Sequence, residues 1–175
     1  MGIFQDFVIK IKNTFSSSNE NDFFTAIPYS LLPSFKTIKK EIQIAFDEKL
    51  PTFDFLKIEI KLSETNVDWS AIIQFSYENN EESTNYKKIN HVNGVVSTEE
   101  TSLPFGFQPF SSIKNEAIDA FRIGQREEQM DCFSFKLYFP LSPFDTEPLW
   151  FMDFEDKKQV IVGADTGSFE VKDLS

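Results

Sequence analysis

The chain has 175 residues, 41% of them hydrophobic and 26% charged, which is enough apolar material for a buried core and excludes disorder of the whole chain. Its net charge is −11, from 17 basic and 28 acidic residues, and the sequence contains no basic patch. Phosphate backbones are bound by basic patches, so we expect no nucleic-acid ligand. The single cysteine excludes an intramolecular disulfide.

Residues 1–33 are predicted to form an amphipathic N-terminal helix and a linker. One helical stripe carries the apolar residues Ile3, Phe4, Phe7, Val8, Ile11 and Phe15. We expect this stripe to pack on the body of the protein or on a second copy of the chain, which would make a homodimer. A membrane surface is disfavoured, because the polar face has just two lysines, Lys10 and Lys12. The segment lacks the features of a signal peptide, and no apolar run approaches transmembrane length, so we expect a cytoplasmic protein.

A nine-residue stretch occurs twice and organises the rest of the chain. Residues 38–46 and 113–121 share five of nine residues, and the shared apolar positions lie on one helical face. The first helix is predicted to begin after the N-cap Ser34 and to end near Leu50, before a proline. The second is predicted to begin at Ser111 or Ser112 and to end at a C′ glycine, Gly124.

Alternating apolar residues after each helix predict strands. The first set covers residues 56–62, 69–77 and 86–92, and the second covers 133–139, 149–154, 160–164 and 168–171. The turns Asn93-Gly94 and Thr166-Gly167 follow the third strand of each set. We therefore expect an α+β protein, in which the N-terminal helix precedes two repeats of a helix packed on a three- to four-stranded antiparallel meander. The predicted repeats are residues 34–103 and 104–175, with residues 98–109 joining the helix-and-strand parts.

The closing stretch, residues 150–171, resembles the end of a PepSY domain. An aromatic-rich strand and a hairpin lead into Val162, Asp165, Thr166 and Gly167, and Gly163 stands where that family usually has Asp. The first repeat carries only the Asn93-Gly94 turn and two following valines. The resemblance implies a helix-and-meander fold and a non-catalytic binding module, in a family often linked to inhibition of proteases or to the cell envelope.

The residues that chemistry most often uses are sparse and apart. His91 and Cys132 are the single histidine and cysteine and fall on predicted strands of different repeats, without ligand-spaced neighbours. The acidic residues lack calcium-loop spacing and occupy predicted loops or helix ends. We therefore predict no catalytic residue, no metal site and no cofactor, and interpret the protein as a non-enzyme.

The remaining interpretation is a binding protein for a basic protein partner, most concretely an acidic immunity-type inhibitor that sequesters a toxin. The 21 phenylalanines are more than this chain easily buries, so some are expected at an interface. The predicted partner-binding residues are three aromatics and six acids: Tyr77, Tyr86, Trp150, Glu81, Glu82, Glu127, Glu128, Asp145 and Glu147. One alternative is a carrier or sensor of a small apolar ligand held between helix and sheet. Another is a PepSY-type protease inhibitor or regulator.

Overall fold

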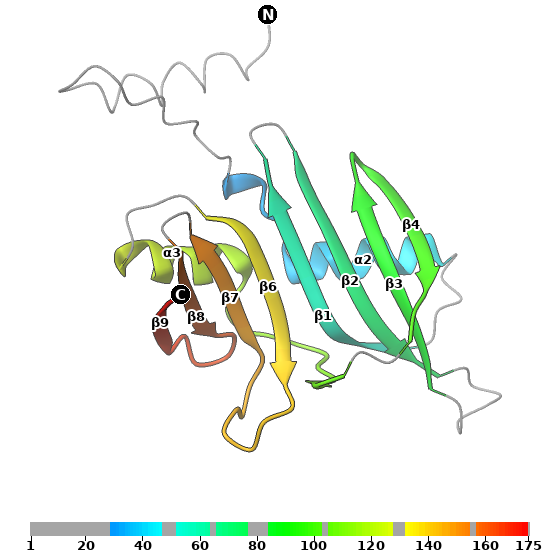
Figure 1. Cartoon of the computed structure of the whole chain (residues 1–175). Helices are drawn as coiled ribbons and strands as arrows, with labels where there is room; N and C mark the ends of the chain where they lie inside the picture. The colour runs from blue at the N-terminus through cyan, green and yellow to red at the C-terminus, as the bar shows by residue number, and fades with distance from the viewer. Residues whose placement is uncertain are drawn as a thin grey trace, which may run out of the picture.

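The computed structural model describes residues 29–46, 52–63, 66–76, 84–102, 105–127, 132–154 and 157–174. This part of the chain contains two α-helices and one large antiparallel sheet, which confirms the α+β class (Figure 1). Its elements are η1 (Tyr29–Leu31), α2 (Phe35–Ala45), β1 (Phe53–Leu62), β2 (Val67–Phe75), β3 (Asn85–Val92), β4 (Val95–Glu100), β5 (Phe107–Gln108), α3 (Ala117–Glu127), β6 (Cys132–Pro140), β7 (Leu149–Phe154), β8 (Lys158–Gly163) and β9 (Phe169–Asp173). The predicted N-terminal amphipathic helix lies outside the described residues.

The sheet is built from two meanders joined at their first strands. The strand order is β4-β3-β2-β1-β6-β7-β8-β9, and β1 pairs antiparallel with β6 over residues 57–61 and 134–138. Helix α2 precedes the first meander and α3 precedes the second. Figure 1 shows both helices on the same face of this sheet. Neither of the two described helices covers the other face, which we call the open face, as is common for antiparallel sheets.

One hydrophobic core lies between the sheet and the two helices. Alternate residues of the strands point into it, including Ile58 and Ile60 of β1 beside Leu137 and Phe135 of β6. The helices contribute the buried residues Ile38, Ile42, Ala117, Ala120 and Phe121. The period-2 pattern therefore predicts correctly the buried residues of β1 and β2 from Ile58 to Ile73, whereas Trp150 of β7, which was expected at an interface, is also buried.

A tyrosine that precedes α2 links the two halves of the molecule. The ring of Tyr29 stacks on that of Phe121 in α3, with 3.7 Å between ring centroids. Its hydroxyl accepts a hydrogen bond from the backbone N–H of Cys132, at the start of β6. Across the same divide, the Glu116 carboxylate accepts a 2.7 Å hydrogen bond from the backbone N–H of Phe35, in the first turn of α2. A carboxylate stabilises this positive end of a helix.

The first helix begins where the sequence predicts but ends earlier. Ser34 is the N-cap of α2, and its hydroxyl accepts a hydrogen bond from the backbone N–H of Thr37. The helix ends at Ala45, five residues before the predicted end, with Phe46 as the C-cap. Ala45 is exposed and Phe46 is half-buried, so the predicted apolar face extends one turn too far.

The second helix differs more from its prediction. It begins at Ala117, and Asp119 in its first turn accepts a hydrogen bond from the backbone N–H of Glu116, which makes half of a capping box. Neither Ser111 nor Ser112 caps it. Gly124 lies inside the helix, at a position where a Cβ would approach the Met152 Cε to 2.9 Å. Close packing on the sheet, and not helix termination, explains this glycine.

The turn and linker predictions have different outcomes. Asn93 and Gly94 have φ angles of 51° and 78° and join β3 to β4, as expected for a tight hairpin turn. The predicted linker 98–109 is partly strand, because β4 extends to Glu100 and β5 pairs with the end of β6. Phe110 then bridges β1 through two hydrogen bonds with Phe55, at 2.8 and 2.9 Å.

Candidate functional site

Two connections meet at the end of the sheet where β6 finishes. The backbone N–H of Leu141, after β6, donates a 2.8 Å hydrogen bond to the carbonyl oxygen of Gly106, just before β5. The amide of Gln108 donates to the carbonyl oxygen of Pro140 at 2.9 Å. These bonds hold the segment at 105–106 beside the start of the β6–β7 connection.

Three large apolar side chains protrude from these two connections. Phe105, Leu141 and Phe144 are 98%, 70% and 90% exposed. We call this group the apolar tip. Burial of one such side chain against a partner would gain about 1.5–3 kcal/mol. Isolated exposed apolar residues are ordinary, but three on adjoining connections form a candidate docking site.

An aromatic row continues from the tip onto the open face of the sheet. The ring of Phe107 packs edge-on against that of Tyr138, with 5.0 Å between centroids. Tyr138 in turn stacks on Phe151 at 4.3 Å, with the ring planes nearly parallel. Partial burial raises the pKa of the Tyr138 hydroxyl. The aromatic row thus packs β5 beside β6 and β7, next to the two connections that carry the tip.

The predicted acids Asp145 and Glu147 both lie in the β6–β7 connection that carries the tip, but they have different roles. Asp145 follows Phe144 directly and is partly exposed, so it adjoins a tip residue along the chain. Glu147 forms hydrogen bonds within the protein. Its carboxylate accepts hydrogen bonds from the backbone N–H groups of Asp165 and Thr166, at 2.6 and 2.8 Å, and from the Thr166 hydroxyl at 2.6 Å.

The charged form of Glu147 is favoured by this arrangement. Partial burial alone would raise the pKa of the carboxyl, but hydrogen bonds from Thr166 and Asp165 and the nearby Lys114 outweigh it and lower the pKa. A lowered folded-state pKa contributes stability above the ordinary pKa, and that stability is lost as the pH falls through the folded-state value. Glu147 therefore holds the β8–β9 turn through its ionised form.

We expect Glu147→Gln to lower the free energy of unfolding by about 1–2 kcal/mol near neutral pH, because a neutral amide replaces a partly exposed charged acceptor. Urea unfolding should show this loss shrinking as the pH falls below the ordinary carboxyl value of 4.5. The matched control is Asp145→Asn, which should change stability little at any of these pH values. A loss for Glu147→Gln that stays constant with pH would contradict the charged role.

Trp150 is not an exposed anchor, contrary to the sequence prediction. It is 2% exposed, and its indole N–H donates a 2.9 Å hydrogen bond to the carbonyl oxygen of Asn115. The reason is strand parity, since Trp150 shares its face of β7 with Met152 and Phe154, which face the helices. Trp150 belongs to the core.

The other predicted partner-binding residues do not form one described surface. Tyr86 is half-buried on β3. Glu127 is the last residue of α3 and precedes β6, whereas Asp145 follows β6. A nine-residue strand is roughly 30 Å long, so these two acids flank opposite ends of β6. Three further acids and one aromatic of the predicted set, Glu81, Glu82, Glu128 and Tyr77, lie outside the described residues.

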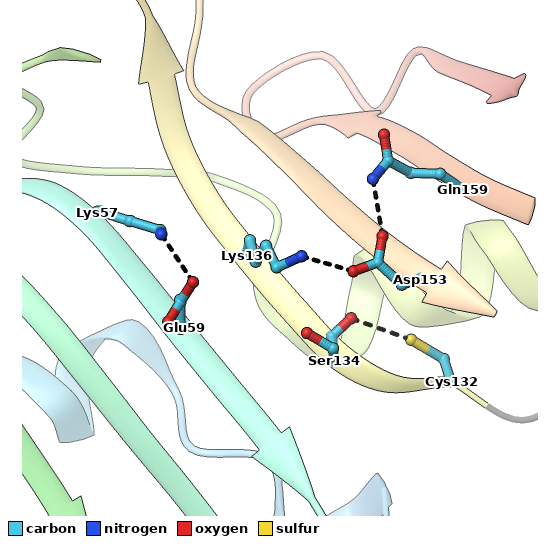
Figure 2. Close-up of polar contacts among 7 residues, drawn as sticks. All are labelled: Lys57, Glu59, Cys132, Ser134, Lys136, Asp153 and Gln159. Carbon is cyan, nitrogen blue, oxygen red and sulfur yellow. Dashed lines mark hydrogen bonds and ion pairs between the residues drawn. The ribbon is translucent and has the colours of Figure 1, made fainter. Parts of the chain in front are cut away.

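Several charges on the open face of the sheet are already paired. The Lys57 ammonium lies 2.7 Å from the Glu59 carboxylate, and Lys136 lies 2.7 Å from Asp153 on the neighbouring strand (Figure 2). The hydrogen bond from Lys136 and a second from Gln159 outweigh the effect of burial and lower the pKa of Asp153. Such pairs are typical of a solvated sheet face and need no ligand to explain them.

The two residues most suited to catalysis or metal binding, His91 and Cys132, make their contacts within the protein. His91 stacks on Trp69, with ring planes 3° apart, and its Nε2 is 4.0 Å from a Glu41 carboxylate oxygen. Cys132 is buried, and its thiol donates to the carbonyl oxygen of Ser134 at 3.4 Å (Figure 2). Within the described ranges, no group of three or more potential ligand residues is placed to hold a metal ion.

A shallow groove lies between α2 and β4. Its lining residues are Glu41, Ile44, Ala45, Val96, Ser97 and Thr98. Its volume is about 310 Å³ and it is open to solvent.

Of the two described helices, neither is long and apolar enough to cross a bilayer.

No family model matches this chain, and no curated protein matches it. The fold is similar to the crystal structure of a "putative lipoprotein" from Clostridium difficile 630, with a TM-score of 0.52 and 10% sequence identity. The similarity covers 87% of this chain and 99% of that one. At this identity the similarity concerns the fold alone.

Proposed function

We propose that this chain is a non-enzymatic binding module whose apolar tip docks on a protein partner. The observation that carries the proposal is the exposure of Phe105, Leu141 and Phe144 on two connections held together by backbone hydrogen bonds. Aromatic side chains at the centre of an interface supply a large share of binding energy. The hydrogen bonds between the two connections hold them together before binding, which reduces the entropy lost on association.

The chemistry of the partner follows from charge. A net charge of −11 attracts a basic protein at long range, which speeds association and makes it sensitive to salt. Asp145, next to Phe144 in the chain, adds an acidic residue to the connection that carries the tip. The most concrete function consistent with these features is an immunity-type inhibitor that sequesters a basic toxin in the cytoplasm.

The finer architecture is part of the same proposal. We interpret the two halves as duplicated PepSY-like units, because each consists of a helix followed by four antiparallel strands in meander order. The similar nine-residue stretches are offset in this arrangement, since Phe46 caps α2 whereas Phe121 lies inside α3. A PepSY-type protease regulator would use the same docking surface, with a peptidase as the partner.

The test is capture of a partner by the full chain and by a double variant, Phe105→Ser with Phe144→Ser. We expect the wild-type chain to retain a basic protein from an extract of its source organism, and the double variant to dissociate from it faster by a factor of about 100 or more. The matched control is Val95→Ser, which removes an exposed apolar side chain from the β3–β4 hairpin.

The outcomes separate the alternatives. Association that slows with added salt supports the basic partner. A captured peptidase would favour the protease regulator. Equal binding by the double variant and the wild-type chain would remove the tip from the interface. Recovery of a small apolar molecule and no protein would move the function to the groove between α2 and β4.

A further inference from the structure

The last strand of the sheet, β9, has one edge that no other described strand covers. Among the described strands it lies at one end of the order and pairs only with β8. All five of its residues are exposed, including Phe169 and Val171 at 49% and 37%. Open strand edges are templates for pairing with another strand.

The hydrogen bonds at both ends of β9 show which backbone groups face outward. The N–H of Gly163 donates to the carbonyl oxygen of Ser168, and the N–H of Leu174 donates to the carbonyl oxygen of Lys157. The register between these bonds is regular, so the even-numbered residues direct their N–H and C=O groups toward β8. The odd-numbered residues Phe169, Val171 and Asp173 therefore direct theirs outward.

We propose that β9 pairs antiparallel with β9 of a second copy, with Val171 opposite Val171, and so joins two sheets into one. In this register the outward backbone groups of Phe169 and Asp173 also meet, and Glu170 lies opposite Lys172 of the second copy on both sides of the axis. These two pairs occupy non-hydrogen-bonded positions, where side chains approach most closely. Within one chain the Glu170 carboxylate and the Lys172 ammonium are now 3.4 Å apart and mostly exposed.

The neighbouring registers are disfavoured by charge. A residue whose backbone groups point outward can form hydrogen bonds only with a residue of the second copy whose groups also point outward. The register can therefore shift only in steps that keep odd-numbered residues opposite odd-numbered residues. One step places Glu170 opposite Glu170, and the opposite step places Lys172 opposite Lys172. Like charges directly opposite each other destabilise a strand pair. Among these two-fold symmetric pairings, the sequence Glu-Val-Lys thus selects the register centred on Val171.

The other edge of the sheet lacks this complementarity. On β4, the carboxylates of Glu99 and Glu100 already pair with Lys88 and Lys87 of β3, at 2.7 and 3.2 Å. The strand Val95–Glu100 contains no basic residue, so two copies of it offer no opposite charges to each other. The second copy is therefore assigned to β9.

The test uses charge reversal and measures association of the full chain by sedimentation across a range of concentrations. We expect a weak wild-type dimer, and a dissociation constant raised about tenfold or more in Lys172→Glu and in Glu170→Lys, because each places like charges opposite each other. Mixing the two variants should restore association, since every pair across the axis is then opposite in charge. Circular dichroism of each variant checks that it is folded.

A second variant tests the edge itself. Val171→Pro removes an outward N–H without removing a hydrogen bond to β8, and should abolish the dimer. A wild-type chain that stays monomeric up to millimolar concentration would overturn the proposal. So would a dimer that none of these substitutions changes, because it would use another surface, such as the stripe at residues 1–15.

Discussion

Phe121→Ala is expected to lower the free energy of unfolding by about 3–5 kcal/mol, as is typical when a buried aromatic side chain is truncated. Phe121 is 4% exposed and packs between Tyr29 and Phe135, with centroid distances of 3.7 and 6.1 Å. Its removal would leave a cavity between α3 and the sheet. It would also loosen Tyr29, whose hydroxyl accepts a hydrogen bond from the start of β6. Urea unfolding measures the loss.

The matched control is Phe46→Ala. Phe46 is half-buried at the end of α2 and meets Phe75 at 6.3 Å between ring centroids. Its truncation should cost about 1–2 kcal/mol, because less apolar area returns to water. Equal losses at the two positions would contradict the difference in burial and would favour equivalent packing of the two similar stretches.

Most of the strands could be predicted from the sequence because their physics is local, but β4 and β5, which lie partly or wholly in the predicted linker 98–109, could not. Side chains alternate between faces, so a sheet with one covered face produces the period-2 pattern seen in β1 and β2. Asn93-Gly94 was equally readable, since a two-residue turn with positive φ at both positions favours these residue types.

Apart from the N-cap Ser34, the helix boundaries could not be predicted, because contacts with residues distant in the sequence help to determine them. Even at the correctly predicted start of α2, the N–H of Phe35 donates to Glu116, 81 residues away in the chain. Gly124 reads as a helix end in the sequence, but its role is to bring α3 close to Met152. The nine-residue similarity also suggested equivalent positions for Phe46 and Phe121 that their burial does not support.

The candidate site was only partly predictable. The number of phenylalanines indicated that some would be exposed, and Asp145 was correctly placed in a connection, next to the exposed Phe144. Phe105 and Phe144 themselves were missed, because irregular segments have no periodicity to show which way a side chain points. A usable signal was present, since each follows a proline and precedes a turn-forming residue, in Pro104-Phe105-Gly106 and Pro143-Phe144-Asp145.

Trp150→Ala should likewise cost about 3–5 kcal/mol of unfolding free energy, which separates a core residue from an interface anchor. The indole fills the space beside the segment that leads into α3, and its N–H donates a hydrogen bond to the carbonyl oxygen of Asn115. The side-chain amide of Asn115 in turn donates to the carbonyl oxygen of Gly163 at 3.3 Å. Trp150→Phe keeps most of the volume but leaves the Asn115 carbonyl without its indole donor, so we expect a smaller loss of about 1–3 kcal/mol.

Phe144→Ala should give the opposite result in the connection that precedes β7. Phe144 is 90% exposed, so its truncation should change the unfolding free energy by less than about 0.5 kcal/mol while it weakens partner binding. Thermal or urea unfolding of both variants, together with dissociation rates from the captured partner, gives the comparison. If Trp150→Ala were as stable as the wild-type chain, Trp150 would not be part of the core. If Phe144→Ala were strongly destabilised, the tip would be a packing element, and its exposure would no longer indicate a docking site.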